Sequence, residues 1–105
     1  MNTFERGQIK VLIYRDKVEG VWYGSALEFN LTVDGEDKNS VVLELDRAVK
    51  EYLQSARELG SVGLLNQEPD PELVNLWEAR IQDKEDDVSS PYTPYFAGRE
   101  SLVYA

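Results

Sequence analysis

The chemistry open to this chain depends on its carboxylates, because the residue types that most often carry catalysis are missing. The sequence contains 20 Asp and Glu, 11 Lys and Arg, and neither histidine nor cysteine. Without histidine there is no usual general base and no imidazole metal ligand. Without cysteine there is no thiolate nucleophile, disulfide or sulfur-bound zinc site. What remains is a cation held by carboxylate oxygens, or acid–base work by a carboxylate pair.

The densest carboxylate group stands in the stretch VDGEDKNS, between an alternating apolar run and a helical pattern. An EF-hand loop requires glycine at its sixth position and glutamate at its twelfth. Counting from Asp34, Gly35 comes second and Leu45 twelfth, so that spacing is not met. Two interpretations stay open. The carboxylates of this stretch hold a cation in a looser site, or the stretch is a strand-to-helix loop in which Asp37 caps the helix.

Elsewhere, acidic residues are so frequent that chance pairs are common and no pair is singled out on physical grounds. We therefore expect no enzymatic activity, no bound metal and no cofactor. The net charge is −9 and the isoelectric point about 4.4. Phosphate backbones repel such a chain, which argues against direct nucleic-acid binding. The acidity either serves solubility or steers a basic protein partner toward the chain.

The expected cellular location follows from the length of the apolar runs and from the absence of cysteine. The first apolar run is far too short for a signal peptide or a membrane span, so we expect no membrane association. A chain without cysteine fits the reducing cytoplasm. We expect a cytoplasmic protein.

The element pattern predicts an α+β fold. Alternation of apolar and polar residues predicts strands over Gln8–Arg15, Val21–Leu27 and Phe29–Val33. Gly24 inside the second strand indicates a bulge or a close approach of neighbouring backbone. From Ser40 to Leu59 the apolar period becomes that of a helix, and Gly60 predicts its end. Its predicted apolar stripe contains Val41, Leu45, Ala48, Tyr52, Ala56 and Leu59, widened by Val42, Val49 and Leu53.

The C-terminal third differs in composition. Asp70-Pro71-Glu72 predicts the start of an amphipathic helix that runs to about Lys84. An extended tail rich in proline and aromatics follows, and residues 101–104 are a candidate final edge strand. Its PYTP segment either binds a polyproline-reading module or, as we favour, docks on its own domain or on a sister subunit. The candidate residues for a partner or subunit interface are Trp77, Tyr92, Tyr95, Phe96 and Tyr104.

Over about residues 9–69 the chain resembles the HicB-like antitoxin family. Those proteins carry a short strand with a carboxyl-rich step, then a glycine, a polar turn and a helix with a Tyr-Leu pair. LEFNLTVDG matches that step at Glu28, Phe29 and Gly35, with Leu27 where proline is usual and Asn30 in place of Asp. Further along, four positions of the helix carry the residue types that the family has there: Leu45, Ala48, Tyr52 and Leu53.

The resemblance implies a three-stranded antiparallel sheet with one packed helix (β-β-β-α), similar to a pared-down RNase H fold. Residues 1–69 would form this domain, and residues 70–105 would append a helix and an extended aromatic tail. RNase H-type catalysis needs several strand carboxylates that hold two metals. Only Glu28 and Asp34 stand at such places here, which supports a non-catalytic role.

The function implied is that of an antitoxin or a relative, which neutralises a small, basic, RNA-cleaving toxin of the HicA type. The alternative is a solitary homo-oligomer, a dimer or tetramer, with a structural or regulatory role and no toxin partner. Many family members carry a DNA-binding motif at the C-terminus, whereas the C-terminal helix here is acidic. That difference argues against direct DNA binding.

Overall fold

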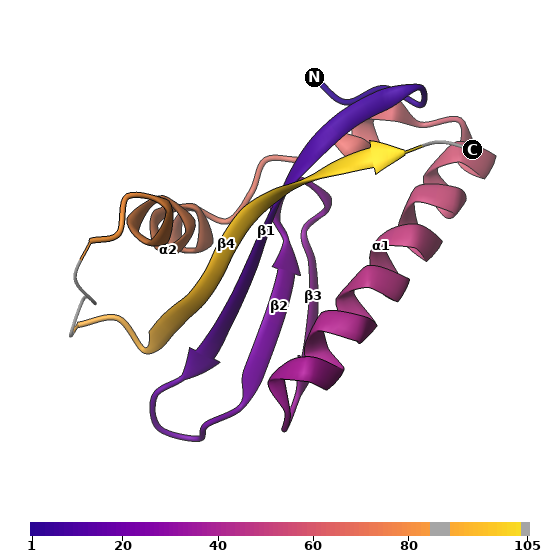
Figure 1. Ribbon diagram of the computed structural model, residues 1–105. Coiled ribbons are helices and arrows are strands. Elements are labelled where there is room, and N and C mark those ends of the chain that lie inside the picture. The colour runs from indigo at the N-terminus through magenta and orange to yellow at the C-terminus, as the bar shows by residue number, and fades with distance from the viewer. Residues whose placement is uncertain (85–88, 104–105) are drawn as a thin grey trace.

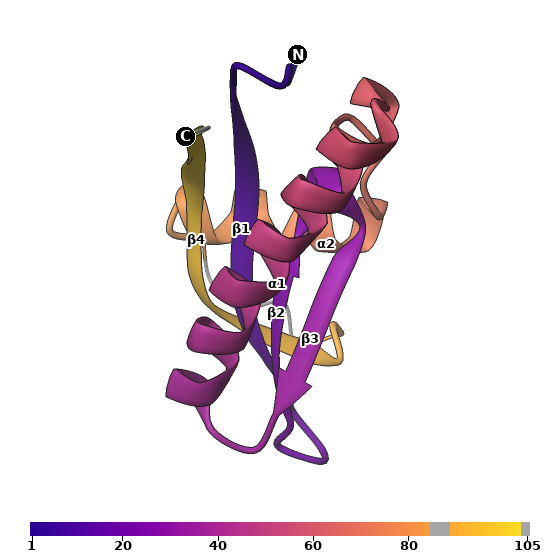
Figure 2. The same ribbon diagram turned by 90° about the vertical axis from the view of Figure 1, so that its right-hand side faces the viewer.

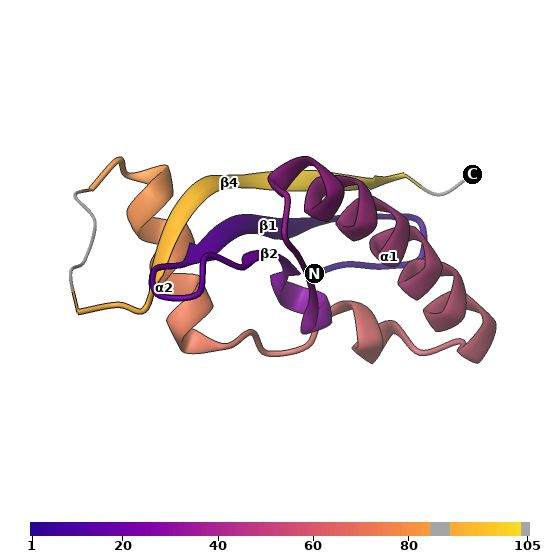
Figure 3. The ribbon, with the colours of Figure 1, turned by 90° about the horizontal axis from the view of Figure 1, so that it is seen from below.

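The computed structural model describes residues 1–84 and 89–103. It is an α+β structure in which a four-stranded antiparallel sheet, of order β3-β2-β1-β4, lies between two helices (Figures 1 and 3). One helix packs on each face of the sheet (Figure 2). The elements are β1 (Arg6–Asp16), β2 (Trp22–Ala26), β3 (Leu31–Gly35), α1 (Lys38–Leu59), α2 (Pro71–Ile81) and β4 (Tyr92–Val103).

The central strand β1 is buried on both faces. Ile9, Val11 and Ile13 belong to the core beneath α1. Leu12 and Tyr14 point to the opposite face and belong to a second core beneath α2. A strand with two apolar faces requires cover on both sides, because each exposed apolar face would cost free energy in water. This requirement accounts for the three-layer arrangement.

Helix α1 begins and ends at the residues that its capping signals indicate. The Oδ2 atom of Asp37 accepts hydrogen bonds from the backbone N–H of Ser40 at 3.2 Å and from its hydroxyl at 3.0 Å. At the other end Gly60 adopts a left-handed φ of 67°, which glycine takes without steric cost. The predicted stripe is confirmed in part by four buried side chains, whereas Val42 and Leu59 are exposed. The buried four are Val41, Leu45, Val49 and Ala56.

Helix α2 also starts as predicted. The Oδ1 atom of Asp70 accepts a hydrogen bond from the backbone N–H of Glu72 at 2.9 Å, and Pro71 occupies the first turn. The helix stops at Ile81 rather than near Lys84. No helix within the described residues is both long and apolar enough to cross a bilayer.

The expected sheet of three strands is wrong by one strand, because the aromatic tail forms β4. This strand pairs antiparallel with β1 along its whole length, from Arg6 opposite Val103 to Asp16 opposite Tyr92. Pro94 and Gly98 interrupt the alternation of the tail, so the sequence indicated extended backbone with a short strand only at its end. The proline is accommodated beside a bulge at Ile13/Tyr14, where the ladder is irregular.

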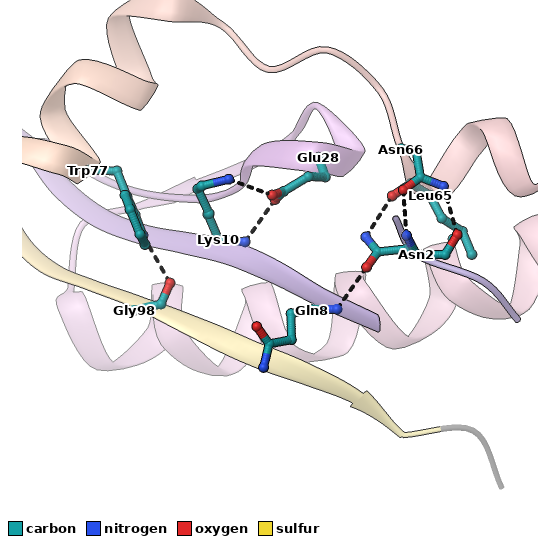
Figure 4. A network of polar contacts seen from close by, with 8 residues as sticks. All are labelled: Asn2, Gln8, Lys10, Glu28, Leu65, Asn66, Trp77 and Gly98. Atoms are coloured by element: carbon teal, nitrogen blue, oxygen red, sulfur yellow. Dashed lines mark hydrogen bonds and ion pairs between the residues drawn. The ribbon is translucent and has the colours of Figure 1, made fainter. Parts of the chain in front are cut away.

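Two short 3₁₀ turns connect these layers. The turn Leu27–Phe29 replaces the start of the expected third strand and ends at Asn30, which has a left-handed φ of 50°. The second, Val62–Leu65, is tied to the N-terminal segment through Asn2 (Figure 4). The side chain of Asn2 donates to the Leu65 carbonyl at 2.9 Å and accepts from the backbone N–H of Gln8 at 2.7 Å.

Gly24 lies where α1 crosses β2, and the structure supports the close-approach interpretation. The β2 ladder is regular at this point, so there is no bulge. A Cβ atom built on Gly24 would lie 3.0 Å from Val41 Cγ1, 3.2 Å from Leu45 Cδ2 and 3.3 Å from Ile13 Cδ1. The missing side chain therefore sets how closely α1 approaches the sheet.

Replacing Gly24 with valine should overpack this crossing and lower the free energy of unfolding by about 1–3 kcal/mol. In urea denaturation this loss should appear as a lower midpoint concentration, with an unchanged slope of unfolding free energy against urea concentration. Gly63→Ala is the matched control, because its Cβ would meet a single side-chain atom at 3.8 Å. Equal stability of Gly24→Val and the parent would contradict the packing described.

Candidate functional site

The acidic junction is a helix cap. The hydroxyl and the backbone N–H of Ser40 both donate to Asp37, and these hydrogen bonds lower the pKa of that carboxyl. In residues 1–84 and 89–103, no three acidic side chains converge in a way that could hold a metal ion. Of the two interpretations of the junction, the described structure supports the strand-to-helix loop.

The side chain of Glu28 supplies a hydrogen-bond acceptor to β1 just beyond the end of β2. Its Oε1 atom accepts a hydrogen bond from the backbone N–H of Lys10 at 2.7 Å, and its Oε2 lies 3.1 Å from the Lys10 ammonium (Figure 4). The last residue of β2 pairs with Val11, so the N–H of Lys10 finds no strand partner beyond it. The side chain of Glu28 is 18% exposed. This carboxylate satisfies a backbone donor that would otherwise be left unpaired.

Trp77 is an internal anchor between α2 and β4. The side chain is 4% exposed, and its indole Nε1–H donates to the Gly98 carbonyl at 2.9 Å (Figure 4). The guanidinium of Arg99 lies 4.7 Å from the ring centroid and the ammonium of Lys10 5.6 Å from it. Trp77 thus holds the last strand on the sheet within one chain.

Tyr92 also packs within the chain. Its ring meets those of Tyr14 and Tyr23 edge-on, with centroids 5.1 Å and 6.0 Å away. The hydroxyl of Tyr14 is hydrogen-bonded to Ser25 at 3.0 Å, and burial raises the pKa of this phenol. Because Tyr92 and Pro94 pair with β1, the PYTP segment docks on its own domain.

Tyr95 and Phe96 are the aromatic side chains that this strand leaves open to solvent. Tyr95 is 43% exposed and leans on Trp22, with ring centroids 4.5 Å apart. Phe96 is 54% exposed and lies over Gly98, where an added Cβ would stand 2.8 Å from the ring. Tyr104 lies outside the described residues. The predicted interface set thus divides into two internal anchors and two exposed aromatics.

The two exposed aromatics form one wall of a groove between β4 and α1. The groove encloses about 560 Å³, and Val11 and Ile13 of β1 form its floor. The opposite wall is α1, where Val42 is 46% exposed. The groove exists because α1 packs on β2 and β3 and leaves the β4 side of that face uncovered.

A carboxylate pair stands in this groove. Glu100 on β4 and Asp46 on α1 both line it, and so do the basic residues Lys38 and Arg99. Burial and the neighbouring Asp46 raise the pKa of Glu100, and the ammonium of Lys50 offsets part of this effect. Sequence reasoning missed Glu100 because its role depends on β4 pairing with β1. The one signal present was Val42, an apolar residue at the margin of the helical stripe.

No family model matches the chain, and comparison with curated proteins and with solved structures finds no similar protein. The HicB-like resemblance therefore stays a prediction. The geometry described above is therefore the evidence for the candidate site.

Replacing Glu28 with alanine should lower the free energy of unfolding by about 1–3 kcal/mol, because the backbone donor of Lys10 and its ammonium lose their acceptor. Chemical denaturation measures this loss. Glu68→Ala is the control, since Glu68 is exposed. Equal effects of the two substitutions would mean that the Glu28 contacts carry no stability.

Proposed function

We propose that this chain is a non-catalytic, cytoplasmic protein-binding module that acts as a HicB-like antitoxin or a relative of one. Its target would be a small, basic, RNA-cleaving protein of the HicA type. The observation that carries the proposal is the outer edge of β4, which lies at the end of the sheet beside exposed aromatics. An unpaired strand edge is a template for another chain, and β-strand addition is a common way to bind one.

The charge of the chain supports a basic partner. A net charge of −9 on 105 residues speeds encounter with a basic surface and disfavours acidic ones. The carboxylates that the sequence offered for metal chemistry have structural partners instead: Asp37 caps a helix and Glu28 bonds Lys10. The features that remain for a binding role are the outer edge of β4, the groove between β4 and α1 and the net negative charge.

The test mixes the purified chain with a HicA-type toxin, encoded beside its gene, and follows cleavage of RNA. We expect stoichiometric inhibition and a complex whose mass is the sum of both chains. Raising the ionic strength from about 0.05 M to 0.5 M should slow association by roughly tenfold, because screening removes the electrostatic steering. Undiminished cleavage in the presence of excess chain would contradict the proposal.

The solitary homo-oligomer is the second candidate, because exposed Tyr95 and Phe96 beside a strand edge also suit self-association. Light scattering of the chain alone distinguishes the two. A stable dimer or tetramer that leaves the toxin active would replace the antitoxin proposal with this one.

A further inference from the structure

The unprotected part of the β4 edge is its C-terminal half. Proteins prevent the edge strands of their sheets from pairing with other chains by means of prolines, bulges, short strands or charges. In β4 the first half has Pro94 and the bulge opposite Ile13/Tyr14, whereas the half from Phe96 to Leu102 has neither. That half carries Arg99 and Glu100, one charge on each face of the sheet. Charges of this kind select a partner rather than exclude every partner.

A strand added to this edge would place alternate side chains in the groove. Strands alternate their side chains, so one face of the new strand would lie beside Phe96, Gly98 and Glu100, on the α1 side. The groove beside Phe96 is mainly apolar, with Val42 exposed on the facing helix wall, although Lys38 of α1 also lines it. Two apolar side chains, two residues apart, fit here because they would bury exposed apolar surface.

A positively charged side chain would be favourable at the position beside Glu100. Asp46 is bonded to Lys50 at 2.9 Å. Within the described part of the chain, no side chain forms a hydrogen bond or an ion pair with the carboxylate of Glu100. This half-buried carboxylate next to a second one is disfavoured in its charged form, as its raised pKa indicates. A lysine or arginine directly across the strand would relieve that cost.

A second copy of the chain does not supply this cation. In an antiparallel β4–β4 pair, side chains of the same face meet, so Glu100 faces a residue from the α1 side of the other copy. Those residues are Phe96, Gly98, Glu100 and Leu102, and none is basic. Arg99 is on the other face, where it stacks on Trp77. A dimer would also combine two chains of net charge −9.

We propose that the groove between α1 and β4 binds an extended basic segment of a partner protein, added as an antiparallel strand on Phe96–Leu102. This deepens the proposed function and rests on it for the identity of the partner. The antiparallel direction continues the sheet and is the more stable pairing. The segment has lysine or arginine at position i, opposite Glu100, and apolar residues at i+2 and i+4, opposite Gly98 and Phe96. Position i+1 faces Arg99 and is not basic.

The experiment uses a fluorescent peptide with the core Lys-Thr-Ile-Thr-Val and the full chain, with anisotropy as the readout. Two control peptides keep the composition: one breaks the alternation as Lys-Ile-Val-Thr-Thr, and one methylates a backbone nitrogen that would face β4. We expect each control to bind at least tenfold more weakly, since the first misplaces the apolar side chains and the second removes a ladder hydrogen bond. Equal binding of all three would overturn strand addition.

Two variants of the chain test the side-chain contacts. Phe96→Ser removes the exposed aromatic wall and should weaken binding about tenfold or more. Glu100→Lys should weaken binding of the lysine peptide by a similar factor. This variant should bind the same peptide with glutamate at position i more tightly, because the charges are exchanged. Leu59→Ser is the matched control, because Leu59 is 73% exposed and does not line the groove. Circular dichroism checks that each variant is folded.

The outcomes separate this inference from the proposed function. If the HicA-type toxin is inhibited equally by Phe96→Ser, Glu100→Lys and the parent, the groove is not its binding site and this inference fails, whereas the antitoxin proposal stands. If the peptide binds as described but no toxin is inhibited, the groove inference stands and the antitoxin proposal fails. A parent chain that is dimeric, and that Phe96→Ser makes monomeric, would assign the edge to a second copy and overturn the proposal.

Discussion

The structure depends on one strand that is apolar on both faces. Ile9, Val11 and Ile13 of β1 point one way, and Leu12 and Tyr14 point the other. A strand of this kind must be central and must be covered twice, because apolar area left in water costs about 25 cal/mol per Å². The chain meets this constraint with β2 and β4 on the two edges of β1, α1 above one face and α2 above the other.

The proposed binding surface is a consequence of how that cover is divided. α1 packs on β2 and β3, at the distance that Gly24 permits, so the β4 side of the same face stays partly open. β4 closes the other side of β1 and becomes the new edge of the sheet, held from behind by Trp77. Among the described residues, an outer strand edge and an open groove therefore occur together, and Glu100 lies where they meet.

The parts of this structure that could be predicted from sequence are those fixed by local signals. Asp37, Gly60 and Asp70 act within a few residues of their own positions, and the structure confirms all three as capping residues. The alternation over Gln8–Arg15 likewise predicted β1 as a strand. β4 could not be predicted as a full strand, because Pro94 and Gly98 break its alternation and its pairing with β1 is non-local.

The candidate site illustrates the same limit. Tyr95 and Phe96 were recognisable as interface candidates because they are large and stand in a tail. Glu100 was not, because its neighbour Asp46 comes from a helix far away in the sequence. Likewise, the sequence pointed to Glu28 as a strand carboxylate, but its bond to the N–H of Lys10 depends on where β2 stops.

Amide hydrogen exchange of β4, in the free chain and in its complex with the peptide of core Lys-Thr-Ile-Thr-Val, tests the account most directly. One N–H in two along this strand faces β1 and should be protected in both states. The alternate N–H groups between Phe96 and Leu102 face away from β1 and should exchange rapidly in the free chain and slowly in the complex. Outward-facing amides that exchange equally fast in both states, in a complex that has formed, would contradict strand addition at β4.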